Sequence, residues 1–196
     1  MAPSTAFAAA LAIDNPGFEA NYFGSNLPAE YLGDVPTGSF PTGPPPADWT
    51  AYYASGGPIG GEFLGVLKPG TAADYTGTGA MPCFPGGAPE GDNMALLYTS
   101  GDTGGDEYGI TQQLTADLEP DMVYTLTVAV GNIQSCEGLV APYQNFFDLG
   151  GFPGYRVQLI ADGIVLAEDI GLLTPGEGLV ETATVIYQSG SGPIPP

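Results

Sequence analysis

The sequence predicts an all-β protein, an antiparallel β-sandwich in which short strands alternate with loops. Three observations lead to this class. Apolar and polar residues alternate along four runs in the C-terminal half, the period of a strand with one buried face. The chain contains 31 Gly and 20 Pro, which favour many turns. A hydrophobic share of 43% over 196 residues is too high for a disordered chain and suits the core of one domain.

The C-terminal half supplies the clearest strands. The four alternating runs are Val123–Val130, Tyr155–Leu159, Ile164–Leu166 and Val180–Ile186. A short turn, residues 161–163, separates the second run from the third, so we expect these two to form a hairpin. A Pro-Gly loop over residues 174–178 leads to the last run. The residues upstream should then form the other half of the sandwich.

Upstream, the apolar runs are shorter and separated by longer loops. They predict four strands, at Asp48–Tyr53, Glu62–Leu67, Met94–Thr99 and Tyr108–Leu114. Residues 24–48 form one long Gly- and Pro-rich loop, and loops of that length are either functional or disordered. Trp49, the single tryptophan, is either a core residue of its strand or the wall of a ligand site.

The charge balance limits the possible partners. The chain has two basic residues, Lys68 and Arg156, and 22 acidic residues, so its formal net charge is −20. This charge repels nucleic acid and anionic membrane surfaces, so we expect neither as a partner. It suits a divalent cation, a neutral ligand or a cationic ligand, and it is equally compatible with a role in solubility alone. No apolar stretch reaches the length of a transmembrane helix, so we expect no membrane insertion.

The absence of histidine excludes several kinds of site. The chain cannot form a Ser-His-Asp or Cys-His catalytic arrangement, nor a His-ligated zinc or iron site. Acid or base chemistry must therefore use carboxylates or tyrosines. A bound metal should be a hard cation that prefers oxygen ligands, such as Ca²⁺.

The termini and the cysteines point to an exported protein. Residues 1–12 are Ala-rich and are interpreted as the remnant of a signal peptide or a disordered segment, with one folded domain over residues 13–196. We therefore expect a periplasmic or extracellular location. Cys83 and Cys136 both lie in predicted loops, where they form either one disulfide or two free thiols.

Two stretches carry candidate site residues. The first is the turn that contains Asp14, Asn15, Phe18 and Glu19, where Phe18 should point inward and Glu19 outward. Carboxylate and carbonyl oxygens gathered in such a turn are the ligands that Ca²⁺ takes. The second stretch is the loop over residues 131–150, whose candidates are Tyr143, Phe146, Phe147 and Asp148. An aromatic loop between core strands forms either a pocket for a hydrophobic ligand or a small core of its own.

Several segments together match the pattern of one known family: Asn15–Glu19, Tyr124–Asn132, Gly154–Leu159, Val165–Ala167 and Leu173–Gly178. In them the chain resembles the Stig cyclases, the calcium-dependent cyclases of cyanobacterial hapalindole-type alkaloid pathways, which are related in fold to carbohydrate-binding modules. Phe147–Val157 fits that family better than it fits generic carbohydrate-binding modules. The resemblance implies a jelly-roll-like β-sandwich with Ca²⁺ near the N-terminal turn, held by Glu19 together with Asp14 or Asn15.

The resemblance also implies an activity. Stig cyclases are understood to promote a Cope rearrangement and cyclisation of a prenylated indole isonitrile, with a carboxylic acid as proton source and aromatic residues around the pocket. Tyr108, Phe146 and Phe147 match pocket positions, and Asp148 is the acid that the aromatic loop offers. The family's closing strand with an Asn-Phe-Asp-type motif has no counterpart before residue 196, so we expect a domain truncated at its C-terminus.

The alternative is a non-catalytic extracellular module that binds carbohydrate, or a surface or matrix protein. A cyclase predicts an enclosed aromatic pocket that includes Tyr108 and the region of Phe146. A carbohydrate-binding module predicts exposed aromatic side chains, such as Trp49 and Tyr52, on an open face. A homo-oligomer is compatible with either function.

Overall fold

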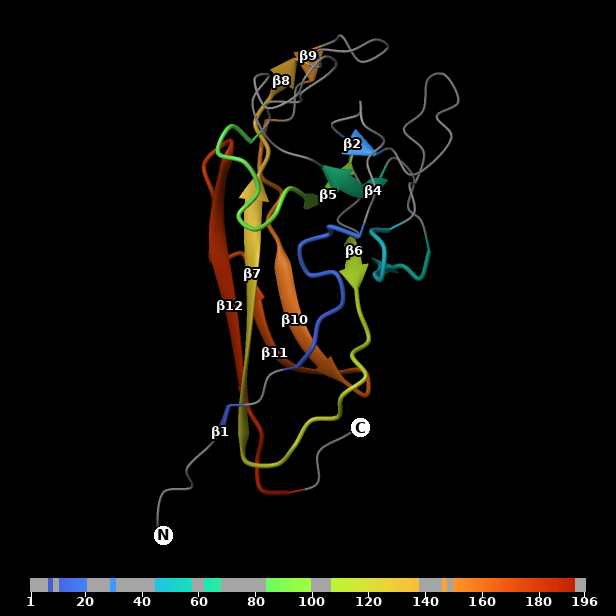
Figure 1. Cartoon of the computed structure of the whole chain (residues 1–196), viewed down its shortest axis with the longest axis vertical. Helices are drawn as coiled ribbons and strands as arrows, with labels where there is room; N and C mark the ends of the chain where they lie inside the picture. The colour runs from blue at the N-terminus through green and yellow to red at the C-terminus, as the bar shows by residue number, and fades with distance from the viewer. Residues whose placement is uncertain are drawn as a thin grey trace. The chain divides into compact units, whose positions relative to one another are not determined.

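The computed structural model describes residues 7–8, 11–20, 29–30, 45–57, 62–67, 84–99, 107–137, 146–147 and 150–192. Every regular element in these residues is a β-strand (Figure 1). The prediction of an all-β chain is therefore confirmed. Within the described ranges, no helix has the length and apolar character needed to cross a membrane.

Contacts within the chain divide it into two compact units. The first unit comprises residues 1–12, 114–133 and 150–196, and the second comprises residues 13–113 and 134–149. The single domain expected over residues 13–196 stays a prediction, and so does the interpretation of residues 1–12 as a leader. In the first unit, Phe7–Ala8 form the short strand β1, which pairs with β7 in parallel.

The main sheet of the first unit is built on two long strands, β7 (Met122–Asn132) and β12 (Leu179–Gln188). They pair antiparallel from Leu179 opposite Asn132 to Gln188 opposite Val123 without a break in register (Figure 1). One face of this pair is buried, because Tyr124 is 4% exposed and Ala183 and Val185 are 1% and 2% exposed. The alternating runs in the sequence therefore predicted both strands, but in β12 the buried residues are Ala183 and Val185, whereas Ile186 of the alternating run is 62% exposed.

The hairpin predicted in the C-terminal half is present. It consists of β10 (Arg156–Ala161) and β11 (Ile164–Ile170), joined at Asp162 and Gly163. These two residues have φ angles of 48° and 73°, the left-handed conformation that a tight hairpin turn needs at both central positions. A register shift between Leu159 and Ile160 places a bulge near the turn.

The second unit contains three small sheets. The strands β2 (Ala29–Glu30), β4 (Glu62–Leu67) and β5 (Met94–Thr99) form one antiparallel sheet in that order. Its core includes Leu64 and Val66, which are 1% and 0% exposed. A second pair joins β3 (Thr50–Tyr53) to β6 (Tyr108–Thr111), and a third joins β8 (Cys136–Glu137) to β9 (Phe146–Phe147). The predicted strands at residues 48–53, 62–67, 94–99 and 108–114 are thus present, two of them shorter than expected.

Four short strands were not predicted. They are β1, β2, β8 and β9, each of two residues. Two residues are too few to show an alternating pattern, so the sequence gives no signal for them. Part of the long loop expected at residues 24–48 is in fact β2, which pairs with β4 at Leu67 and Val66.

Candidate functional site

The N-terminal turn of the second unit is organised by Asn15. Asn15 has a φ of 48°, and its Oδ1 accepts a hydrogen bond from the Ala20 N–H at 2.9 Å. Its carbonyl oxygen accepts one from the Phe18 N–H at 3.1 Å. Asn tolerates the left-handed region because its short amide can bond locally in this way. The turn therefore has a defined conformation, in which Phe18 is half-buried and Glu19 is exposed.

Asn15 also connects the turn to the loop before β3. Its Nδ2 donates to the Ala47 carbonyl at 2.8 Å, and the Trp49 Nε1 donates to the Asn15 carbonyl at 3.2 Å. The Trp49 ring packs against Phe18 with ring centroids 5.7 Å apart. Trp49 is half-buried, and its indole N–H is already hydrogen-bonded within the protein. These contacts give Trp49 a structural role beside the turn.

Gln112 links the same two segments from the other side. Its Oε1 accepts from the Asp14 N–H at 2.9 Å, while its Nε2 donates to the Asp14 carbonyl at 2.8 Å and to the Asp48 carbonyl at 2.9 Å. Asp48 has a φ of 68°, so the loop is held in an uncommon conformation. Sequence reasoning missed Gln112, because its partner Asp14 is 98 residues away along the chain.

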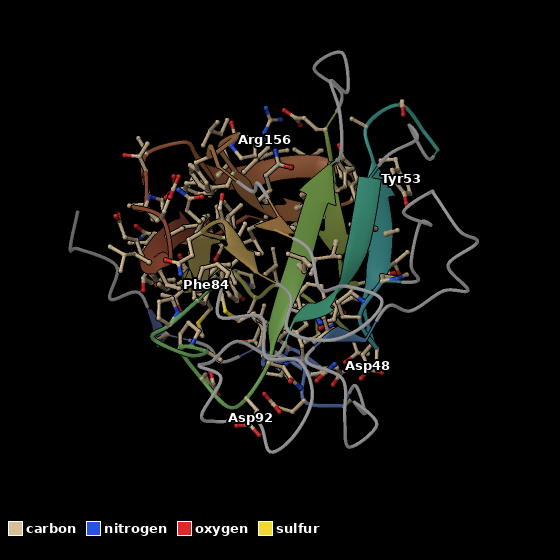
Figure 2. The ribbon with its side chains drawn as sticks, turned by 90° about the horizontal axis from the view of Figure 1, so that it is seen from above. Asp48, Tyr53, Phe84, Asp92 and Arg156 are labelled. Carbon is tan, nitrogen blue, oxygen red and sulfur yellow. The ribbon has the colours of Figure 1, made fainter. Side chains whose placement is uncertain are left out.

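Glu19 joins the N-terminal turn to the turn before β5. Its Oε1 accepts hydrogen bonds from the Asp92 and Asn93 N–H groups at 2.7 and 2.9 Å, and its Oε2 accepts from the Asn93 Nδ2 at 3.2 Å. Gly91 has a φ of 62°, and a Cβ there would lie 2.9 Å from the Glu19 Cδ. The carboxylate therefore occupies the space that a side chain at position 91 would need. Figure 2 labels Asp92 in this turn.

Asn93 carries an unusual oxygen. The residue is 5% exposed, and its Nδ2 donates to the Phe18 carbonyl at 3.1 Å as well as to Glu19. Those two bonds fix the orientation of the amide, so Oδ1 faces the other way. Among the described residues, this Oδ1 is the one buried side-chain oxygen or nitrogen without a hydrogen-bond partner. A buried oxygen without a partner has a cost in stability that a bound cation removes.

The hydrogen bonds of the N-terminal turn show which oxygens could serve the metal site expected at Asp14, Asn15 and Glu19. Both ends of the Asn15 amide are already bonded to the protein, and Asp14 uses its backbone groups to bind Gln112. Glu19 instead lies on the Nδ2 side of the Asn93 amide, so its carboxylate and the Asn93 Oδ1 do not face each other. Carboxylate and amide oxygens are each ligand types that Ca²⁺ takes. No group of three or more Asp, Glu, Cys or His residues with metal-site geometry occurs in the described ranges. The expected site at the N-terminal turn stays a prediction.

The β3–β6 pair carries the aromatic candidate Tyr108. Tyr53 lies directly opposite Tyr108 and Ala51 lies opposite Ile110, so these four half-buried residues share one face. Tyr52 points to the other face, opposite Gly109, and is 44% exposed. Tyr53, labelled in Figure 2, was not among the predicted site residues. Its inward position follows only from the register with β6.

Other predicted residues cannot be placed. Tyr143, Asp148 and Cys83 lie outside the described residues. Phe146 and Phe147 form β9, in which Phe147 is opposite Cys136 and Phe146 is opposite Glu137, but only their backbone is described. The disulfide between Cys83 and Cys136, the pocket role of the phenylalanines and the acid role of Asp148 stay predictions.

The first unit contains a buried carboxylate that sequence reasoning missed. Asp169 is 6% exposed, and its Oδ1 accepts a hydrogen bond from the Tyr155 hydroxyl at 2.8 Å. The Leu173 N–H donates to the same hydroxyl at 3.3 Å, and the Gly171 N–H donates to the Tyr155 carbonyl at 3.1 Å. Burial and the bond to Asp169 raise the pKa of Tyr155 above its usual value. Tyr155 thus fixes the chain where it leaves β11.

Comparison with known proteins identifies similar structures. The family model described as HpiC1-like, HpiC1 cyclase, matches residues 9–194. The solved Stig cyclase Fisc from Fischerella sp. TAU, in complex with (3Z)-3-(1-methyl-2-pyrrolidinylidene)-3H-indole, is 30% identical with a TM-score of 0.69 over 92% of this chain and 79% of that one. A cyclase from Fischerella sp. TAU in complex with 4-(1H-indol-3-yl)butan-2-one is 30% identical with a TM-score of 0.67 over 93% and 80%.

An apo cyclase from Fischerella sp. is 28% identical with a TM-score of 0.66 over 92% of this chain and 78% of that one. No curated protein matches the sequence. The Stig cyclases among these neighbours have a β-sandwich fold, so the predicted β-sandwich class is confirmed.

Proposed function

Because the chain belongs to the HpiC1-like family of Stig cyclases, we propose that it catalyses the acid-promoted rearrangement and cyclisation of a prenylated indole. The observation that carries this proposal is the family match over residues 9–194, together with indole compounds bound to two similar structures. Family membership also agrees with the resemblance seen in the sequence. We further propose export of the chain to the periplasm or the cell exterior, from the Ala-rich residues 1–12.

The half-buried face of β3–β6 is the part of the described chain that suits an indole. Tyr53 and Tyr108 lie directly opposite each other on it, next to the Ala51–Ile110 pair. Aromatic faces attract a cation, so the two rings would stabilise positive charge that develops on the substrate during cyclisation.

The reaction also needs a proton donor. A carboxylic acid that is kept neutral by burial can protonate the indolenine nitrogen, and the aromatic face then holds the resulting cation. Asp148 remains the proposed acid, because it belongs to the aromatic loop that contains Phe146 and Phe147. The absence of histidine leaves carboxylates and tyrosines for this role.

We assign Ca²⁺ a structural role at the N-terminal turn, held by Glu19 and Asn93. Two observations support this assignment: the buried Asn93 Oδ1 has no partner, and the Asn93 Nδ2 donates to the Glu19 carboxylate. When bound, Ca²⁺ would supply positive charge to these oxygens, and it would stiffen the join between the N-terminal turn and the turn before β5.

The test is an assay of the full chain with a prenylated indole isonitrile and Ca²⁺, with products separated by chromatography and identified by mass spectrometry. We expect a cyclised product, and we expect Tyr53→Phe and Tyr108→Phe to lower its rate or change the product ratio. Tyr52→Phe is the matched control, because Tyr52 is the adjacent residue on the opposite face. A folded chain that yields no cyclised product would contradict the cyclase proposal.

A carbohydrate-binding module is the second candidate, since Tyr52 is 44% exposed between the exposed residues Thr50 and Ala54. A sugar that stacks on Tyr52 should change the tyrosine fluorescence on titration, and Tyr52→Ala should abolish that change. A saturable change together with no product in the cyclase assay would favour the binding module.

A further inference from the structure

The pairing of β3 with β6 is short, and its residue types do not fix its register. Four residue pairs make up the ladder, and Tyr53 opposite Tyr108 is the pair at one end. A shift of β3 by one residue would place Tyr52 opposite Tyr108 and turn Tyr53 to the other face. An aromatic pair forms in either register, so side-chain pairing alone gives little preference between the two. Contacts outside the four pairs must therefore decide which tyrosine faces inward.

Hydrogen bonds beyond the four pairs hold both ends of the ladder. At one end, the Ala54 N–H donates to the Glu107 carbonyl at 2.9 Å, which adds one backbone bond. At the other end, the Nε2 of Gln112, the first residue after β6, donates to the Asp48 carbonyl at 2.9 Å. Asp48 lies two residues before β3 and has a φ of 68°, so the extended backbone of β3 is interrupted there. A side chain therefore joins β6 to the segment that enters β3.

The N-terminal turn fixes the side chain of Gln112 itself. Its Oε1 accepts from the Asp14 N–H at 2.9 Å, and its Nε2 donates to the Asp14 carbonyl at 2.8 Å. Both ends of the amide are thus bonded to the backbone of one residue, which orients Nε2 for the bond to Asp48. A shift of β3 along β6 would break that bond.

We propose that Gln112 is a positioning residue that sets the register between β3 and β6 and thereby holds Tyr53 opposite Tyr108. The inference rests on the proposed function, because this tyrosine pair belongs to the face that suits the indole. A shift of one residue moves a strand by about 3.3 Å, and a misplacement of about 1 Å can lower a catalytic rate about 100-fold. The bonds of Gln112 would therefore affect the reaction although its side chain touches no substrate.

The test compares one variant with two controls. Gln112→Leu removes three hydrogen bonds and keeps a side chain of similar size. Gln113→Leu is the matched control, because it makes the same change at the exposed neighbouring position. Val66→Ala is the stability control, since Val66 is a fully buried residue of β4, outside the β3–β6 pair. Thermal melts set an assay temperature at which every variant is folded.

Nuclear magnetic resonance measures the register directly. In the wild-type chain and both controls, we expect cross-strand nuclear Overhauser effects between the backbone protons of Tyr53 and Tyr108. Gln112→Leu should weaken them, and contacts between Tyr52 and Tyr108 should appear. Unchanged contacts in Gln112→Leu would overturn the proposal. This measurement needs no substrate, so a wild-type chain that gives no cyclised product would contradict the proposed function while the register is still tested.

The enzyme assay measures the effect on the reaction. With a prenylated indole isonitrile, we expect Gln112→Leu to lower kcat several-fold and to change the product ratio, while both controls keep the wild-type product ratio. Gln112→Glu should follow Gln112→Leu, because it keeps an acceptor for the Asp14 N–H but loses the donor for the Asp48 carbonyl. If Gln112→Leu and Val66→Ala have the same kcat and product ratio, Gln112 contributes only to stability and the proposal is wrong.

Discussion

Single residues in the candidate site differ widely in how much the sequence reveals about them. Asn15 and Glu19 lie in a local turn that its residue types predict, so their positions could be predicted as well. The position of Asn93 could not be predicted, because Asn93 bonds to Glu19, which is 74 residues away in the sequence, and no local pattern indicates such a pair. Asp169 was missed for a related reason: a carboxylate on a strand is ordinarily assigned to water, and here Tyr155 holds it inside.

Gly91 is a position at which a side chain would be strongly unfavourable. Its positive φ and the nearby Glu19 carboxylate both exclude a side chain. Gly91→Ala should lower the free energy of unfolding by about 1–3 kcal/mol or more, from the left-handed backbone alone, with the steric overlap added. Urea denaturation measures this. Gly87→Ala is the control, because Gly87 also has a positive φ, 78°, but a Cβ there meets nothing within 4 Å; equal losses in both variants would show that the Glu19 contact is unimportant.

Tyr155 should make stability depend on pH in the alkaline range. Its pKa is raised in the folded chain by burial and by Asp169. The unfolded state therefore loses the phenol proton first, so the contribution of Tyr155 is fully present below its unfolded pKa of about 10 and is lost as pH rises through the folded pKa. Thermal melts between pH 8 and pH 11 should show a smaller alkaline loss for Tyr155→Phe than for Tyr52→Phe. The same loss in both variants would argue against this origin.

At the level of elements, strand length decides what the sequence can predict. The strands β7 and β12 are 11 and 10 residues long, enough for a clear alternation, and the hairpin was marked by Asp162 and Gly163. The two-residue strands β8 and β9 lack any such pattern. The register between β3 and β6, which brings Tyr53 beside Tyr108, joins strands from distant parts of the chain and was likewise beyond local reasoning.

Gln112 provides a test of how elements are joined, since it follows β6 and holds both the N-terminal turn and the loop before β3. Gln112→Leu removes three hydrogen bonds, to two backbone groups of Asp14 and to the Asp48 carbonyl. Each bond contributes about 0.5–1.5 kcal/mol, and water replaces part of that contribution. We therefore expect the free energy of unfolding to fall by about 1–2 kcal/mol. Hydrogen exchange should become faster at the Asp14 amide. Gln113→Leu, at the exposed neighbouring position, should leave that exchange rate unchanged.

At the scale of the whole molecule, the net charge of −20 affects every measurement of stability. Repulsion between like charges destabilises a compact chain, so any salt should raise the melting temperature to some degree. A specific Ca²⁺ site must therefore be separated from general screening. The comparison that does so holds ionic strength constant and exchanges Mg²⁺ for Ca²⁺, because Mg²⁺ keeps its water and demands a smaller, stricter geometry.

The proposed site makes a definite prediction in that comparison. Ca²⁺ at 100 times its dissociation constant should stabilise the folded chain by about 2.7 kcal/mol beyond Mg²⁺, because it binds the native state alone. Glu19→Gln should remove this increment, since the amide keeps an acceptor for the Asp92 and Asn93 N–H groups but loses the negative charge. Melts with Ca²⁺, Mg²⁺ and chelator measure both effects. If Ca²⁺ and Mg²⁺ stabilise the wild-type chain equally, the cations act by screening, and the unpartnered Asn93 Oδ1 must have another explanation.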